Sequence, residues 1–366
     1  MKIAFLNIYG GINQRGAESF SHELANRLSE NHEVVFFQAG QKTSEEHITV
    51  NRIESPAVQP QSSFPARFPD NLLKRLFLDE ANRAIFSFTR KVIPRLTRES
   101  FEVVIPMNGF WQLFLLMLCP PFGNYKILTT GHSGPGWDER FNLYLHPNVF
   151  VATTMPAYEW AKSTCPWTRV ELIPYAIDDR PYQAAKPETL PLSKPIILCP
   201  AALVPYKRIE LAIEAVSGLK DASLLVLGQG PLEDKLLALG RKKLGKRFLL
   251  TSVSHNRMPS FYAACDLVTL PSDPQENSPM VFLESLAAGK LVVTTDTPRN
   301  RWMLEGAGVF CDPTVSLAYR NALSRTLGSE NEEKTKAAIG SAFSKFRWTK
   351  VKQAYQRILT SLEDGK

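Results

Sequence analysis

Residues 267–289 restrict the possible folds most tightly, because they join a strand, a loop and a helix in one short stretch. Residues 267–270 are apolar and predict a buried strand. Ser278 is expected to cap the helix that follows, with Pro279 at its first position, where a missing N–H costs nothing. Gly289 is expected to end that helix in the C′ position. The pattern predicts a strand whose carboxyl end feeds directly into a helix N-terminus.

The same stretch has two features that suit an anionic, hydroxyl-bearing ligand. The backbone N–H groups of Met280 and Val281 are expected at the positive end of the helix dipole, an arrangement that binds phosphate. Glu276 and Glu284 are eight positions apart, which suits two hydroxyl-bearing rings joined by a diphosphate better than a close carboxylate pair. The alternative is a surface loop with solvated carboxylates. That alternative fits a single glutamate better than it fits the whole pattern.

Length and charge narrow the class of protein. A chain of 366 residues suggests two domains or a single large one. Its net charge of +7 favours anionic partners such as phosphates and acidic membrane surfaces. No nucleic-acid partner is expected, because no nucleic-acid-binding motif accompanies this mild basic balance.

Three features predict a cytoplasmic protein. The five cysteines are scattered and read as reduced thiols. The first residues begin a strand at once, so no signal peptide is expected. The longest apolar run, residues 110–119, is too short to cross a bilayer.

The N-terminal segment reads as strand (residues 2–8), glycine-rich turn (9–16), helix (17–29) and strand (34–37). Such a βαβ unit is typical of nucleotide-binding α/β folds. It lacks the G-x-G-x-x-G pattern, so a dinucleotide is poorly supported and no cofactor is expected. A tight turn without a ligand remains the alternative for this loop.

Residues 71–98 are strongly basic and predict one or two amphipathic helices. One interpretation is a solvated basic face. The other is docking to an anionic membrane surface or acceptor. The cations are Lys74, Arg75, Arg83, Arg90, Lys91, Arg95 and Arg98, interleaved with Leu72, Leu73, Leu76, Phe77, Ile85, Phe86 and Phe88.

A single histidine follows a predicted strand. His132 comes directly after residues 125–130, in a loop with three glycines. Most isolated histidines are structural, but the carboxyl ends of strands in open α/β sheets are where ligands bind. His132 is therefore a candidate site residue.

The proline-rich segment 179–195 lacks periodicity and predicts an interdomain linker. The expected domains are residues 1–178, completed by a terminal helix from residues 346–366, and residues 196–345. In the second domain, Lys207 lies near a helix start, either as a solvated residue or as a ligand for an anion.

The Glu276-x7-Glu284 pattern in its strand–loop–helix setting resembles the signature of family 4 glycosyltransferases. Gly16-Ala17-Glu18, His32-Glu33-Val34 and residues 173–178 are similar to runs of the same family, although Tyr175 and Ala176 depart from it. The resemblance implies a GT-B fold: two Rossmann-like α/β domains facing a cleft, with the last helix crossing back to the first domain.

The resemblance also implies residue roles. Glu276 would contact the hydroxyls of the donor sugar, Glu284 those of the ribose, and His132 the transferred sugar. Lys207 would neutralise the donor diphosphate. The expected catalytic residues are thus His132, Lys207 and Glu276, and the expected donor-binding residues are Gly10, Gly11, Arg15, Gly16, Arg208, Gly228, Val253, Ser254, Pro279, Met280, Val281 and Glu284.

One departure from the family pattern bears on the diphosphate. Ala202 stands where the family has a second cation, an arginine, and Arg208 stands where it has a glycine. Losing a cation there would weaken stabilisation of the leaving group. Arg208, and after it Arg15, are expected to compensate.

The reaction implied by the resemblance is hexosyl transfer from a nucleotide diphosphosugar, with a UDP-sugar expected, to a hydroxyl acceptor. It would retain the anomeric configuration, need no metal, and serve polysaccharide or glycolipid synthesis. Two alternatives stay open: a sugar-nucleotide 2-epimerase of the same fold, and a non-catalytic nucleotide-sugar-binding protein, which the alanine at position 202 motivates.

Overall fold

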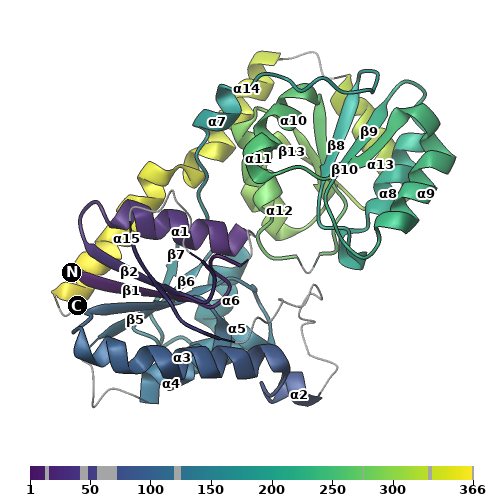
Figure 1. Cartoon of the computed structure of the whole chain (residues 1–366). Coiled ribbons are helices and arrows are strands. Elements are labelled where there is room, and N and C mark those ends of the chain that lie inside the picture. Colours follow the sequence, from purple (N-terminus) through teal and green to yellow (C-terminus); the bar gives the residue numbers. More distant parts are fainter. Residues whose placement is uncertain are drawn as a thin grey trace. The chain divides into compact units, whose positions relative to one another are not determined.

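A computed structural model describes residues 1–12, 16–41, 48–55, 72–118, 125–274, 276–328 and 332–364. Arg15 and residues 56–71 lie outside these ranges. The chain divides into two compact units, shown in Figure 1. Unit 1 comprises Met1–Tyr175 and Thr349–Lys366, and unit 2 comprises Ala176–Trp348.

Unit 1 is built on a sheet of seven strands in the order β3-β2-β1-β4-β5-β6-β7. Every neighbouring pair is parallel. Such a sheet needs helical crossovers, which cover both of its faces. The strands are β1 (Lys2–Asn7), β2 (Glu33–Gln38), β3 (Thr49–Arg52), β4 (Val103–Pro106), β5 (Lys126–Gly131), β6 (Val149–Ala152) and β7 (Val170–Leu172).

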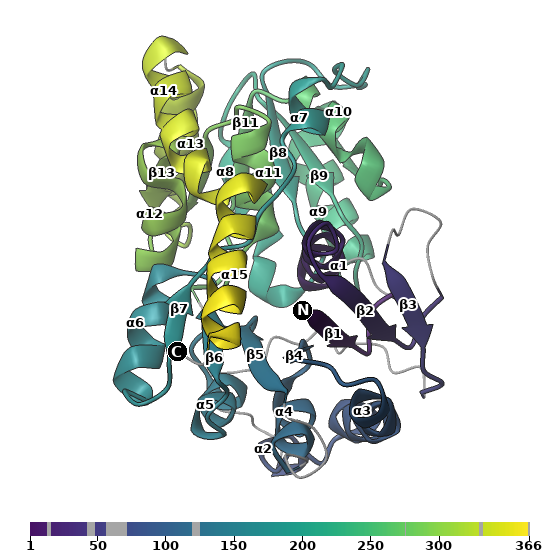
Figure 2. The ribbon, with the colours of Figure 1, turned by 90° about the vertical axis from the view of Figure 1, so that its left-hand side faces the viewer.

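The side chains of β1 alternate between the two faces of the sheet. Ala4 and Leu6 share a core with Phe88 of α3 and Leu113 of α4. On the other face, Phe5 stacks on Phe36 at 5.7 Å between ring centroids. Figure 2 shows α1 and α15 on the face opposite α3 and α4. The helices of this unit are α1 (Gly16–Leu28), α2 (Leu72–Arg75), α3 (Glu80–Arg98), α4 (Gly109–Leu118), α5 (Trp137–Tyr144), α6 (Met155–Thr164) and α15 (Trp348–Glu363).

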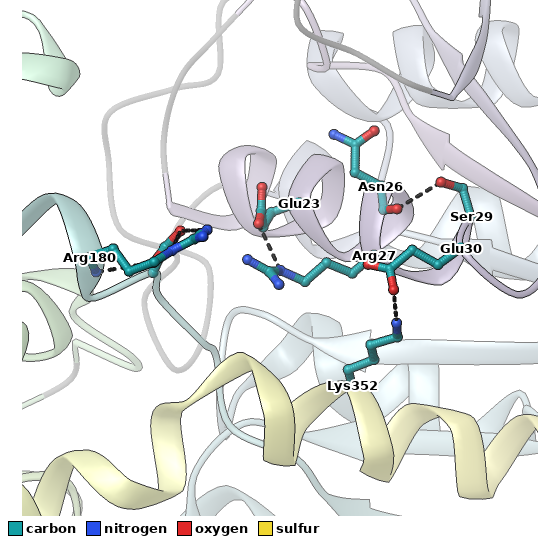
Figure 3. A network of polar contacts seen from close by, with 8 residues as sticks. Glu23, Asn26, Arg27, Ser29, Glu30, Arg180 and Lys352 are labelled. Carbon is teal, nitrogen blue, oxygen red and sulfur yellow. Dashed lines mark hydrogen bonds and ion pairs between the residues drawn. The ribbon is translucent and has the colours of Figure 1, made fainter.

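The terminal helix α15 is bonded to several parts of unit 1. Lys352 pairs with Glu30 at the end of α1, as Figure 3 shows, and the same view shows Arg27 paired with Glu23 within α1. The hydroxyls of Tyr355 and Thr130 share a hydrogen bond of 3.5 Å. Arg169 donates to Ser361 at 2.9 Å. These contacts hold the last helix against a sheet whose strands come from the first half of the chain.

Unit 2 repeats the architecture with six parallel strands in the order β10-β9-β8-β11-β12-β13. Helices α8, α9 and α13 lie on one face, and α10, α11 and α12 on the other (Figure 1). The strands are β8 (Ile196–Pro200), β9 (Ser223–Leu227), β10 (Phe248–Thr251), β11 (Leu267–Leu270), β12 (Val292–Thr295) and β13 (Gly308–Cys311). The helices are α7 (Arg180–Gln183), α8 (Ile209–Ser217), α9 (Glu233–Leu244), α10 (Met258–Ala264), α11 (Met280–Ala287), α12 (Pro298–Leu304), α13 (Ser316–Leu327) and α14 (Glu332–Phe343).

The predicted linker, residues 179–195, is instead part of unit 2. Its first residues form α7, where Tyr182 packs edge-on against Tyr262 of α10. The Glu188 N–H donates to the carbonyl of Ser260 at 3.0 Å, and the Glu188 carboxylate pairs with Arg257. The prolines leave this segment without a helical pattern in its sequence, but these contacts hold it against α10. The sequence analysis also missed three short elements: β3, α5 and α12.

The loop after β9 approaches the loop after β8 so closely that Gly228 has no room for a side chain. A larger residue at this position should therefore destabilise the protein. A Cβ at Gly228 would lie 1.9 Å from the carbonyl oxygen of Ala201. We expect Gly228→Ala to lower the free energy of unfolding by about 1–3 kcal/mol, the usual cost of overpacking. Urea denaturation measures the change.

Gly340 provides the matched control for this substitution. It lies in α14, and an added Cβ there meets nothing within 4 Å. Gly340→Ala should be neutral or stabilise the protein by up to about 1 kcal/mol, as alanine does in a helix. Equal stability of the Gly228→Ala and Gly340→Ala variants would contradict the close approach.

Candidate functional site

The strand order of unit 2 places a topological switch point between β8 and β11. From β8 the chain moves outward through β9 to β10, then returns to β11 and moves outward on the other side through β12 to β13. Loops that follow the two central strands diverge at their carboxyl ends, and ligands of open α/β sheets bind there. The loop after β8 carries Lys207, and the loop after β11 carries Glu276.

Lys207 and Glu276 form a buried ion pair at this switch point. Lys207 ends the 3₁₀ turn Pro205–Lys207, just ahead of α8, and the two side chains are only 10% and 8% exposed. Burial alone would raise the pKa of Glu276, but Lys207, with Ser272 and Arg299, more than offsets it, so this pKa lies below its usual range. Two residues predicted separately from the sequence are therefore in direct contact, both charged.

Arg208 forms a second ion pair, with Asp273 of the same β11 loop. The Asp273 N–H also donates to the carbonyl of Tyr206 at 2.7 Å, so the two loops are joined twice. Arg208 has a φ of 51°, in the left-handed region that favours glycine. This backbone conformation explains why a glycine would fit at this position. The predicted compensation by Arg208 thus involves a cation that is already engaged by a carboxylate.

Arg299 is a buried cation that the sequence analysis did not identify. It lies in the first turn of α12, after β12, with 7% of its surface exposed. Its guanidinium donates to Asn300 Oδ1 at 2.8 Å and to the carbonyl of Pro274, in the β11 loop, at 3.3 Å. Burial lowers its pKa to about 10, which Glu276 and Asp273 partly oppose, so Arg299 is charged at neutral pH. In the sequence, Thr297-Pro298 shortly after a strand indicates a helix start, and this signal would have placed Arg299 in the first turn of a helix.

Helix α11 begins one residue later than predicted. Pro279, with φ −69° and ψ 115°, occupies the N-cap position, so the expected cap at Ser278 and first-turn place for Pro279 are both wrong. The first turn closes when the Phe282 N–H donates to the Pro279 carbonyl at 3.1 Å, which leaves Met280 and Val281 at the helix start. Gly289 follows the helix with φ +70°, so the prediction of its C′ conformation is confirmed.

Glu284 lies in α11 and is buried. It accepts a 2.7 Å hydrogen bond from the Tyr262 hydroxyl of α10. Burial raises the pKa of Glu284, while the hydrogen bond from Tyr262 and the proximity of His255 act in the opposite direction. The carboxylate is therefore held in one orientation by a phenol that has no charge of its own at neutral pH.

The other donor-site candidates of unit 2 also follow strands at this edge of the sheet. Gly228 comes after β9, and its N–H donates to the Thr251 carbonyl at the end of β10 at 3.0 Å. Val253 and Ser254 follow in the loop after β10, where Val253 is half-buried and Ser254 exposed. The structure thus places these three residues in adjoining loops beside the switch point.

In unit 1, Gly10 and Gly11 follow β1, the strand at that sheet's own switch point. Gly11 has φ +69°, and a Cβ there would lie 2.3 Å from the Gln41 carbonyl oxygen, while one at Gly10 would lie 2.8 Å from Gln38 Oε1. Packing against the loop after β2 is sufficient reason for both glycines. Gly16 begins α1, and Arg15 lies outside the described residues.

His132 follows β5 directly and contacts Tyr175, one of the two departures from the family pattern. His132 Nδ1 and the Tyr175 hydroxyl share a hydrogen bond of 2.5 Å. Burial lowers the pKa of His132 to about 4, so the imidazole is neutral at pH 7. The preceding Gly131 has no room for a side chain, since a Cβ would lie 2.6 Å from the Phe150 ring. The position of His132 is therefore fixed from both sides.

Glu139 of α5 supports the loop that carries His132, and the sequence analysis missed it. One carboxylate oxygen accepts the Ser133 N–H at 2.9 Å, and the other accepts the Asn142 side-chain amide at 3.0 Å. Burial raises the pKa of Glu139 to about 7, against the effect of these hydrogen bonds. The loop thus depends on an acid that titrates near neutral pH.

An apolar groove of about 660 Å³ lies elsewhere in unit 2, along β13 and α13. Its lining includes Leu291, Val309, Leu317 and Arg325 and contains none of the predicted site residues. The charged residues at the switch point, not this groove, carry the features expected of an anion site.

The raised pKa of Glu139 predicts a pH-dependent stability. Because the pKa of Glu139 is about 7 in the folded state, whereas an unperturbed glutamate has a pKa of 4.5, the wild type should lose stability as pH rises through that window. Glu139→Gln removes this titration. The free energy of unfolding of the variant, relative to that of the wild type, should therefore rise by on the order of 3 kcal/mol between pH 4.5 and 7.5. Urea denaturation across that range measures the difference.

Other titrating groups, such as His132, are present in both proteins and cancel in this comparison. Glu159→Gln, at an exposed position of α6, serves as the control and should give a curve parallel to that of the wild type. A Glu139→Gln curve parallel to the wild type would show that Glu139 ionises freely in the fold.

Comparison with solved structures identifies the architecture. The whole chain matches a sucrose-phosphate synthase from Thermosynechococcus elongatus with a TM-score of 0.78 and 15% identity, covering 100% of both chains. It also matches HepE from Anabaena, solved with UDP and glucose, with a TM-score of 0.73 and 18% identity, covering 99% of this chain and 100% of that one. The expected GT-B fold, with two parallel-sheet α/β domains, is confirmed.

Sequence comparison points to the same class. Over 110 residues the chain is 31% identical to the lipopolysaccharide 1,2-N-acetylglucosaminetransferase of Salmonella typhimurium, and the alignment spans 28% of each protein. Residues 183–342, nearly all of unit 2, match the family of glycosyl transferases group 1. The protein therefore has a GT-B fold, and most of its second unit is similar to glycosyl transferases group 1.

Proposed function

We propose that this protein is a retaining glycosyltransferase of family 4, which transfers a hexose from a UDP-sugar to a hydroxyl acceptor. The observation that carries the proposal is the buried Lys207–Glu276 pair at the switch point of a group 1 domain. Glu284, eight positions further on, is held by Tyr262 in the helix that the same loop enters. A lysine, two buried carboxylates and a helix N-terminus at this edge suit a donor that joins two hydroxyl-bearing rings through a diphosphate.

The comparisons support the choice of donor and acceptor class. HepE, a structural neighbour, is solved in complex with UDP and glucose. The Salmonella relative is a lipopolysaccharide N-acetylglucosaminetransferase. We propose accordingly a UDP-sugar donor and an acceptor in polysaccharide or glycolipid synthesis.

In the proposed donor complex, positive charge at the switch point meets the diphosphate. Lys207 and the N-terminus of α11 would stabilise the charge that develops on the leaving group. Glu276 would accept hydrogen bonds from the donor sugar, and Glu284 from the ribose hydroxyls. His132, neutral at pH 7, would offer its imidazole to a hydroxyl of the transferred sugar. We propose that the reaction uses no metal and no cofactor, with these protein groups supplying the electrostatic stabilisation.

The proposed chemical step is a front-side displacement. The bond between the anomeric carbon and the diphosphate oxygen breaks, and the acceptor oxygen bonds to the same face of that carbon. The acceptor's proton passes to the departing phosphate oxygen, so atoms and charge balance without a covalent enzyme intermediate. The anomeric configuration is retained.

Product analysis tests the proposed function. The protein is incubated with a panel of nucleotide sugars and candidate glycolipid acceptors, and the products are followed by mass spectrometry and NMR. A new glycoside with the donor's anomeric configuration is expected. An epimerised donor would instead establish a 2-epimerase, and a donor that binds but stays unchanged would establish a non-catalytic binding protein.

Glu284 provides a prediction for nucleotide binding. Glu284→Ala should weaken UDP binding by about 1–3 kcal/mol, because the ribose hydroxyls lose a buried acceptor. A 2′,3′-dideoxy UDP analogue should bind the variant and the wild type equally, since it lacks those hydroxyls. Isothermal titration calorimetry measures both ligands, with Glu233→Ala on the exposed face of α9 as the control. An unchanged affinity for UDP would remove Glu284 from the site.

We also propose that α2 attaches the protein to anionic membranes. Leu72, Leu73 and Leu76 are 66%, 49% and 53% exposed, beside Lys74 and Arg75. The helix is held firmly: the indole N–H of Trp137 donates to the Arg75 carbonyl at 3.0 Å, and that of Trp111 to the Phe77 carbonyl at 2.6 Å. Exposed leucines next to fixed cations suit a surface of anionic headgroups over acyl chains. No described helix is long and apolar enough to cross a membrane. We propose a cytoplasmic protein that binds the inner membrane face.

Vesicle flotation tests this attachment. Replacing Leu72, Leu73 and Leu76 together with serine should reduce flotation with anionic vesicles roughly tenfold or more, because the apolar contribution is lost. Raising the salt concentration should release the wild type. Val315 and Leu317 are similarly exposed in unit 2, so their replacement by serine is a matched control that should float like the wild type. A wild type that stays in solution at low salt would overturn the proposal.

A further inference from the structure

We propose that Arg299 supplies the excess positive charge of the donor site, in place of the arginine that Ala202 replaces. The inference rests on the proposed function, because it concerns recognition of a nucleoside diphosphate. It assigns that recognition to a residue on α12, outside the loop where the family pattern has its second cation. Arg299, rather than Arg208, is the compensating residue.

The arrangement of ion pairs carries this assignment. Lys207 pairs with Glu276, and Arg208 pairs with Asp273. Arg299 donates hydrogen bonds to two neutral oxygens, those of Asn300 and Pro274, and among the described residues it forms no ion pair with a carboxylate. Glu276 and Asp273, the two carboxylates of the β11 loop, are therefore each paired with another cation. The charge of Arg299 is the one that remains to attract an anion.

The surroundings of Arg299 keep this charge in place. Thr297 caps α12 by accepting the Asn300 N–H at 3.1 Å. The Asn300 side chain donates to the Thr295 carbonyl at 2.8 Å and accepts from Arg299. The hydrogen bond from the Arg299 guanidinium to the Pro274 carbonyl joins α12 to the loop that carries Asp273 and Glu276. A fixed charge in a water-poor setting acts on a nearby anion without first having to be ordered.

Ala202 cannot perform this role itself. Its side chain is exposed and uncharged, and its carbonyl accepts the Val204 N–H at 2.9 Å in the turn that leads to Lys207. Arg208 is held by Asp273 and constrained by its left-handed backbone. Among the described arginines near the switch point, Arg299 is thus the cation whose charge is not already matched.

The test compares ligands that differ only in phosphate content. UDP, UMP and uridine are titrated by calorimetry into the wild type, Arg299→Gln and Arg299→Lys. We expect Arg299→Gln to weaken UDP binding roughly tenfold or more, UMP binding less and uridine binding by under about twofold, because the lost term is electrostatic. Arg299→Lys keeps the charge and should bind UDP within about threefold of the wild type.

Arg301→Gln is the matched control. Arg301 lies two residues further along α12 and is 59% exposed, with its guanidinium paired to Asp296. This variant should bind all three ligands like the wild type. Thermal melts establish that each variant is folded, and if Arg299→Gln unfolds, Arg299→Lys can still overturn the inference by equal losses for UDP and uridine.

Two outcomes would overturn the inference. Equal losses for UDP and uridine in either Arg299 variant would mean that Arg299 shapes the loop and does not attract phosphate. Unchanged UDP binding in Arg299→Gln would remove it from the site. Failure of the proposed function looks different, since the wild type itself would then bind neither UDP nor UMP.

Discussion

The buried ion pair between Lys207 and Glu276 is the interaction on which the arrangement of unit 2 depends. Removing two charges from water costs several kcal/mol per ion, and their mutual attraction offsets this only in good geometry. Two apolar residues would hold the same loops together at least as well. A lysine and a glutamate kept at the junction of two diverging strands are thus better explained by a ligand than by stability. The pair joins the loop after β8 to the loop after β11 at the centre of the sheet.

Other charged residues contact the same two loops. Arg208 and Asp273 tie the same loops together a second time, and Arg299 approaches from α12 through the Pro274 carbonyl. Three helices and loops that follow three different strands therefore meet at one edge of the sheet. Parallel strands place all of their carboxyl ends on that edge, so a short segment from each suffices to build the site. Unit 1 uses the same edge of its own sheet for His132 and for the glycines after β1.

The sequence predicted the features that are local. Apolar runs identified most strands, and the Glu276 to Gly289 stretch gave a helix whose end is confirmed by the positive φ of Gly289. Features that depend on distant partners were missed. Arg299 and Glu139 are ordinary polar residues in the sequence, and only burial against other segments gives them their roles. The contacts of residues 179–195 were missed for the same reason, because proline content cannot show that the Glu188 N–H donates to the Ser260 carbonyl. Ser278 was preferred as a cap by its type, although Pro279 occupies that position.

The lack of space beside Gly131 has an evolutionary consequence. Its Cα faces the Phe150 ring of the adjacent strand, with the Glu139 carboxyl group close behind. Any side chain at position 131 would need a smaller residue at position 150, or else the backbone before His132 would move. These two positions should therefore vary together among related sequences, with bulk gained at one balanced by bulk lost at the other. Gly136, on the far side of the histidine, is not restricted in this way, because an added Cβ there would meet only the Gly134 carbonyl oxygen, at 3.7 Å.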